Sequence, residues 1–327
     1  MLPQLERQYL QANLSQVQAL LADCTPDEDP IGHHQYAQLA DELSAKLLAM
    51  PGVIAQAPAG VALFFGGRPV VGSHGIHAEF SSKALDGFQK IVSQRFASEE
   101  LGPLASKGRV PLKDNTHLLI TDVVRGSFGF VLQAAAPDDA TRAADTSLKA
   151  VVDKVACTIS RVAAQDDMLF EETVAEIDER QKSSLSEFFK LLDTEGATLR
   201  MVEGERDFEL DAAAVQRARR RVEQLQIVDH SQDFTGQVVG WTDFSAKFEL
   251  RRHDTHEVIQ GGVTIDALNK VTVEGIEPYH KHVRVTVKVR EVTARNRAVK
   301  TAYTLLSLEP IAAPLDWERP ALQTAIR

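Results

Sequence analysis

The stretch Lys281–Val292, KHVRVTVKVREV, decides how the C-terminal part of this chain folds. Valine occupies every second position from Val283 to Val289, and polar or basic residues fill the positions between them. Because successive side chains of a strand point to opposite faces, this alternation predicts a strand with one buried face and one exposed face. The valines therefore point into a core, and the charged side chains stand on one outer stripe.

Four further segments with a period of two accompany this strand within residues 227–312: TGQVVGWT, AKFELRR, HEVIQGGV and TAYTLLSLE. The third and fourth strands are separated by TIDALNKVTVEGIEPY, which is long enough for a short helix. Five strands with a helix between the third and fourth is the order of an oligonucleotide-binding (OB) type of barrel. An SH3-like small barrel fits nearly as well. We predict a five-stranded β-barrel over 227–312 and a tail over 313–327.

The residues before the barrel predict an α+β region over 1–226. Residues 1–55 have the apolar spacing of two helices. Residues 56–177 read as hairpin, helix, hairpin, helix, and residues 178–226 as helix, hairpin, helix. The expected fold class is therefore α+β, with a helical and α+β N-terminal region joined to an OB-like or SH3-like barrel.

The last predicted helix of 56–177 carries an apolar stripe at alternating steps of four and three: Leu148, Val152, Val155, Ile159 and Val162. Such a stripe packs either against a sheet of its own domain or against a second copy of itself. The first arrangement is the commoner one, and the second predicts a homodimer through these residues.

Composition limits the setting in which this chain works. It is 44% hydrophobic and 25% charged with a net charge of −10, which argues against binding nucleic acid over its whole surface. It lacks an apolar run of about 18 residues and an apolar block at its start, so we expect neither a membrane span nor a signal peptide. The two cysteines, Cys24 and Cys157, lie far apart, which fits a reducing cytoplasm.

The outer stripe of the fourth barrel strand is a candidate nucleic-acid surface. Residues 281–300 carry a net charge of +6 in a chain that is acidic overall. A positive groove on a small barrel is how single-stranded nucleic acid is often bound. The predicted contact residues are Lys247, Arg251, Arg284, Lys288 and Arg290. The stripe also fits a solvated strand face that discourages edge pairing, or a surface that docks on the acidic N-terminal region.

The segment SHGIHAEF is a candidate metal site. Read as a strand, it puts His77 and Glu79 on one face, and His74 could swing towards them. Two histidines and a carboxylate are ligands of non-haem iron and hydrolytic zinc. The alternative is a hairpin followed by a helix with Ser81 or Ser82 at its N-cap, and it is favoured because no distant further ligand stands out. No cofactor is predicted.

Two stretches of the chain, GGRPVVGSHGIHAEF and FELRRHDTHEVIQGGV…VRVTVKVREV…YTLLSLEP, resemble uncharacterised bacterial proteins that join an N-terminal α+β region to a C-terminal five-stranded barrel. The resemblance covers most of the chain. Its motifs are structural, so it implies a fold and no activity.

Three hypotheses of function follow. The first is a non-enzymatic cytoplasmic binding or adaptor protein whose barrel presents the surface for a protein or nucleic acid. The second is a single-strand nucleic-acid binder that uses the basic stripe. The third is a metal-dependent enzyme centred on His74, His77 and Glu79.

Overall fold

The computed structural model describes residues 3–26, 29–50, 59–102, 104, 108–124, 128–134, 142–174, 176–204, 206–243, 246–293 and 299–313. The predicted tail lies almost entirely outside these ranges. Contacts group the chain into two compact units. Unit 1 comprises 1–93, 113–163 and 187–218, and unit 2 comprises 94–112, 164–186 and 219–327. The predicted domain boundaries remain predictions.

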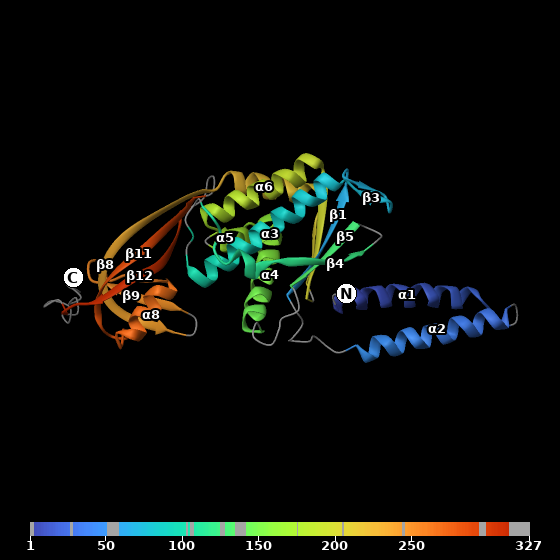
Figure 1. Ribbon diagram of the computed structural model, residues 1–327, viewed down its shortest axis with the longest axis horizontal. Helices are drawn as coiled ribbons and strands as arrows, with labels where there is room; N and C mark the ends of the chain where they lie inside the picture. Colours follow the sequence, from blue (N-terminus) through green and yellow to red (C-terminus); the bar gives the residue numbers. More distant parts are fainter. Residues whose placement is uncertain are drawn as a thin grey trace, which may run out of the picture. The chain divides into compact units, whose positions relative to one another are not determined.

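Unit 1 is built on a five-stranded sheet in the order β4-β5-β1-β6-β7, in which all neighbours are antiparallel (Figure 1). The strands are β1 (Gly60–Gly67), β4 (Leu118–Val124), β5 (Phe128–Ala134), β6 (Ala197–Glu203) and β7 (Arg206–Leu210). The central strand β1 is buried on both faces from Gly60 to Phe65, which explains its continuous apolar run.

Helices pack on the sheet of unit 1 through apolar stripes. They are α3 (Ala78–Leu101), α4 (Arg142–Ala163), α6 (Glu179–Glu195) and α7 (Ala212–Glu223), and α3, α6 and α7 also contribute residues to unit 2. A short 3₁₀ helix, Lys113–Thr116, precedes β4. Phe65 of β1 meets Phe80 of α3 edge to face, with ring centroids 5.3 Å apart.

The apolar stripe of α4 is buried within its own chain. Its five residues are each at most 3% exposed, and α4 contacts β1, β6 and β7. This is the arrangement expected for a helix that covers its own sheet. A homodimer through Leu148, Val152, Val155, Ile159 and Val162 stays a prediction, and it would require α4 to leave that sheet.

The two predicted N-terminal helices are present as α1 (Pro3–Asp23) and α2 (Pro30–Ala49), which pack against each other (Figure 1). Leu5 of α1 joins a core cluster with Ala62, Phe64, Val131 and Val202 of the sheet. Arg200 of β6 lies over the ring of Phe64, pairs with Asp207 and donates to Gln8 of α1. These contacts fix the start of α1 on the sheet.

The first predicted hairpin is not confirmed. β1 pairs with β5 and β6, while the short strands β2 (Val70–Val71) and β3 (Gly75–Ile76) pair only with each other among the described residues. The second and third predicted hairpins are present as β4–β5 and β6–β7. The local apolar pattern identified β1 as a strand but did not identify its partners.

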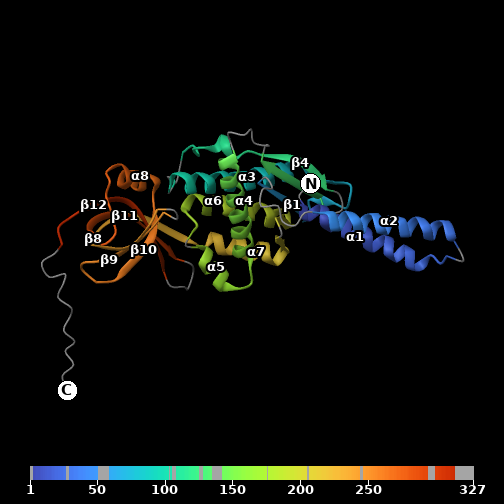
Figure 2. The same ribbon diagram turned by 90° about the horizontal axis from the view of Figure 1, so that it is seen from below.

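Unit 2 contains the five-stranded barrel, which is closed in the order β10-β12-β11-β8-β9 (Figure 2). Its elements are β8 (Gln226–Thr242), β9 (Lys247–Arg252), β10 (Val258–Val263), α8 (Ile265–Val273), β11 (His282–Thr293) and β12 (Lys300–Pro310). β10 and β12 run parallel, and the other neighbours are antiparallel. The prediction of five strands with a helix between the third and fourth is confirmed.

The alternation in Lys281–Val292 forms a strand with one buried face, as predicted. Val283, Val285, Val287 and Val289 are at most 3% exposed and lie in the barrel core with residues from each of the other strands and from α8. Unit 2 also holds α5 (Asp167–Val174) and the first residues of α6. None of the helices among the described residues combines the length and apolarity needed to cross a bilayer. The cytoplasmic location stays a prediction.

Candidate ligand groove of the barrel

The structure divides the predicted basic stripe into separate parts. Lys288 and Arg290 both pair with Asp229 of β8, at 2.7 Å from Nζ to Oδ2 and 3.0 Å from Nε to Oδ1. Partial burial disfavours the ionised Asp229, but its hydrogen bonds to Arg290 and Lys288 outweigh that effect and hold its pKa below the ordinary value. Two of the five predicted cations therefore share one carboxylate in the barrel wall, which balances one of their two charges.

Arg251 and Arg284 stay on the exposed outer face of the barrel. Arg251 faces Gln237 of β8 across the ladder, and Arg284 faces Thr235 two residues away on the same strand. Beside them, His253 and His282 share a hydrogen bond of 2.9 Å between Nε2 and Nδ1. Burial, followed by the neighbouring His282, lowers the pKa of His253. The fifth residue, Lys247, lies at the far end of β9 and lines a groove described below.

An Asp229→Asn variant tests whether the stripe binds nucleic acid. If it does, releasing Lys288 and Arg290 should raise the affinity for a labelled single-stranded oligonucleotide several-fold. It should also steepen the plot of log affinity against log salt by about 1.4, since each phosphate contact contributes roughly 0.7 for single strands. Fluorescence anisotropy at several salt concentrations measures both quantities. Asp266→Asn on α8 makes the same change of charge away from the stripe, and equal slopes for the two variants would contradict a nucleic-acid role.

The predicted shared strand face of His77 and Glu79 is wrong, because α3 begins at Ala78. The backbone N–H of Ser81 donates to the carbonyl of His77, so the helix starts four or five residues earlier than a cap at Ser81 or Ser82 implies. Glu79 lies in that turn and pairs with Lys83 at 2.6 Å. The hydrogen bond from Lys83 lowers the pKa of Glu79.

His77 and Glu79 still line a common small pocket of about 370 Å³ with Lys83 and Glu195. His74 is not among its lining residues; its N–H closes a turn on the carbonyl of Val71. Among the described residues, no group of three or more His, Cys, Asp or Glu side chains could hold a metal ion. The residues of the metal hypothesis are therefore near one another in sequence without forming a ligand set.

The barrel carries a larger groove of about 1010 Å³. It follows β10 from Val258 to Gly262, and the start of β9 and Thr301–Tyr303 of β12 form its other walls. This volume is at the upper end of the range of about 300–1,000 Å³ that small-molecule sites occupy.

The groove is acidic. Glu249 of β9, Glu257 before β10 and Glu176 line it, against the single cation Lys247 among its described lining residues. Glu249 faces Gln260 across the β9–β10 ladder and Gly240 across the β8–β9 ladder, and its carboxylate lies on the outer face over Gly240. An acidic lining favours a cationic ligand and disfavours the phosphates of a nucleic acid.

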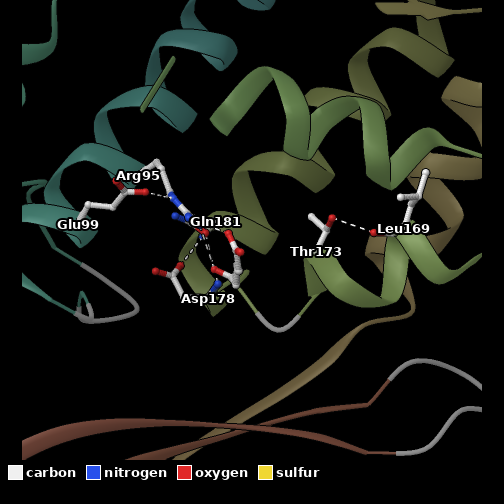
Figure 3. A network of polar contacts seen from close by, with 7 residues as sticks. Arg95, Glu99, Leu169, Thr173, Asp178 and Gln181 are labelled. Carbon is white, nitrogen blue, oxygen red and sulfur yellow. Dashed lines mark hydrogen bonds and ion pairs between the residues drawn. The ribbon is translucent and has the colours of Figure 1, made fainter. Parts of the chain in front are cut away.

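Glu176, which lines the groove, pairs with Arg95 of α3, and Figure 3 shows Arg95 with Glu99 near Asp178 and Gln181. Arg95 of α3 donates from Nη2 to Glu176 at 2.8 Å and from Nε to Glu99 at 2.6 Å. Burial alone would lower the pKa of Arg95, but the two carboxylates together raise it. Asp178 and Gln181 exchange hydrogen bonds as a capping box at the start of α6. The loop that carries Glu176 is thus fixed on both sides.

Sequence reasoning missed Glu176, Glu249 and Glu257. The available signal was the pair Gly261–Gly262 inside a strand, since glycine at such a position often marks a close approach of another backbone. A Cβ on Gly261 would lie 2.0 Å from the carbonyl oxygen of Tyr303. The glycine therefore permits β10 and β12 to meet at one end of the groove.

Comparisons with known proteins find no matching family model, curated protein or solved structure. The resemblance to bacterial proteins with a C-terminal barrel stays a prediction.

Proposed function

We propose that this chain is a non-enzymatic binding or adaptor protein whose barrel holds a ligand in the groove along β10. The observation that carries the proposal is the groove itself, about 1010 Å³ in volume and lined by three strands of the barrel. Its lining includes the apolar Val258 and Ile259 as well as charged side chains, which is the mixture that ligand sites use for affinity and orientation.

The barrel is of the OB type in this proposal. Support comes from the closed strand order, from the parallel pairing of β10 with β12, and from α8 between β10 and β11. Barrels of this type bind ligands on the face of their second and third strands. Here these strands are β9 and β10, which form the groove.

Photo-crosslinking in intact cells tests whether the groove is occupied. Gln260→p-benzoylphenylalanine places the crosslinker on the exposed face of β10, and Asn269→p-benzoylphenylalanine places it on the exposed face of α8 as a control. We expect adducts at position 260 that are absent at position 269. Identical adduct patterns, or no adduct at position 260, would refute the groove as a binding site.

Single-stranded nucleic acid is the second candidate ligand. Arg251 and Arg284 support it, because both are exposed on the outer face of the barrel and no ion pair with an acidic residue is found for either among the described residues. Arg251 on β9 and Arg284 on β11 lie on the two sides of β8, and Arg251 also faces Val258 at the end of the acidic groove. The Asp229→Asn experiment above decides this candidate independently of the crosslinking result.

A further inference from the structure

The ladder between β10 and β12 is the shortest of the barrel ladders that the structure describes. It joins three residue pairs, from Gly261–Tyr303 to Val263–Leu305, while the other ladders join five or more. On the N-terminal side of these pairs, Val258–Gln260 of β10 and Lys300–Ala302 of β12 are not paired with each other. The opposite edges of the two segments are occupied by β9 and β11.

These unpaired segments of β10 and β12 form a wall of the groove. Val258, Ile259 and Gln260 line it from β10, and Thr301 and Ala302 line it from β12. Three residues of a strand extend about 10 Å at 3.3 Å per residue, so the unpaired edge of β10 is long enough to pair with a short extended peptide. Such an edge offers backbone donors and acceptors in a row, which is how strand addition supplies affinity.

The charges around the edge define the ligand further. Glu257 precedes the unpaired segment, Glu249 stands beside Gln260 on the neighbouring strand, and Glu176 lies on the loop fixed by Arg95. A peptide strand beside β10 would bring alternate side chains to the outer face, where these carboxylates are. Lysine and arginine side chains can pair with the carboxylates of Glu249 and Glu257, while Glu176 already pairs with Arg95.

We propose that the groove binds an extended, Lys- or Arg-containing segment of a partner protein, which pairs as an added strand with the edge of β10 at Val258–Gln260. This inference rests on the proposed binding function and names the ligand class for the same groove. The added segment runs antiparallel to β10, since antiparallel pairing is the more stable arrangement per residue.

A random array of ten-residue peptides, probed with the full chain, tests this chemistry without knowledge of the partner. We expect the bound peptides to be enriched in Lys and Arg, and the best of them, labelled with fluorescein, to bind at least tenfold more weakly to Glu249→Gln/Glu257→Gln. Glu274→Gln, an exposed acid at the end of α8, is the control and should leave the affinity unchanged.

The same labelled peptide with N-methyl groups on alternate residues tests the strand pairing, because it keeps the charges and removes backbone donors on one edge. Binding should fall at least tenfold for one of the two methylation registers. No bound peptide, neutral or acidic bound peptides, or equal binding of both methylated forms would overturn the inference. Adducts at position 260 in the crosslinking experiment would then still support a binding groove with a different ligand, so the two failures are distinguishable.

Discussion

Gly261→Ala is expected to destabilise the barrel by about 3 kcal/mol, the upper end of the usual cost of overpacking. The added Cβ would lie 2.0 Å from the carbonyl oxygen of Tyr303 and 2.7 Å from its carbonyl carbon. Both atoms belong to the backbone of β12, which cannot rotate away as a side chain can. β12 also pairs with β11 over ten residue pairs, so relieving the overlap would disturb the barrel wall.

Gly262→Ala is the matched control for this experiment. It adds the same methyl group one residue later in β10, where the nearest atom is 4.0 Å from the new Cβ. We expect it to be neutral or slightly stabilising, because alanine restricts the unfolded chain more than glycine does. Equal stabilities of the two variants would contradict the close approach of β10 and β12.

Tryptophan fluorescence can follow the barrel by itself. The chain has two tryptophans, and Trp241 packs against the barrel core. In a Trp317→Phe background, urea unfolding monitored through Trp241 therefore reports on unit 2. The unfolding midpoint should drop clearly for Gly261→Ala and stay within error of the parent protein for Gly262→Ala.

The barrel was predictable because its signal is local. Every second residue from Val283 to Val289 is buried, and a period of two in one segment is sufficient to predict a strand and its faces.

The pairing of Lys288 and Arg290 with Asp229 was not predictable in the same way. Their partner Asp229 lies in the first half of β8, where most residues are exposed and the sequence shows no alternation. That half of β8 is a strand because β11 pairs with it, which is a contact about 60 residues apart in sequence.

The candidate site was missed for a related reason. A groove lined by β9, β10 and β12 depends on where pairing stops between strands about 40 residues apart, and no local pattern encodes that end point.

For the segment around His77, a local pattern predicted a strand where the structure has the start of a helix. Its alternation of apolar and polar residues fits a strand over five residues, but Glu79 and Lys83 at helical spacing favour the helix that forms.

Glu203→Gln is expected to stabilise the protein in a pH-dependent manner. The Glu203 side chain is 5% exposed and lies next to Asp153 of α4. Burial, followed by the interactions with Asp153, raises its pKa to about 8, although Arg206 and Lys149 act in the opposite direction. At neutral pH the folded protein therefore keeps Glu203 mainly protonated, and glutamine reproduces the protonated form with its hydrogen-bond donor.

The sign of the pH dependence follows from this raised pKa. Between about pH 4.5 and 8 the unfolded chain has released the proton of Glu203 and the folded chain still holds it, so the stability of the parent protein falls as the pH rises through this window. Glutamine does not ionise, so the stability of the variant does not fall in this way as the pH rises. We expect a gain of about 2 kcal/mol at pH 8.5 and less than about 1 kcal/mol at pH 5.0, which is smaller than the full shift because the site can relax around an ionised carboxylate.

Urea unfolding followed by circular dichroism at the two pH values measures the gain, with Glu209→Gln on the neighbouring strand β7 as the control. Glu209 is exposed, so its substitution should change stability by a similar small amount at both pH values. A gain for Glu203→Gln that is equal at pH 5.0 and 8.5 would show that the carboxyl is ionised in the folded protein at both. In that case Arg206 and Lys149 would hold Glu203 as a buried carboxylate.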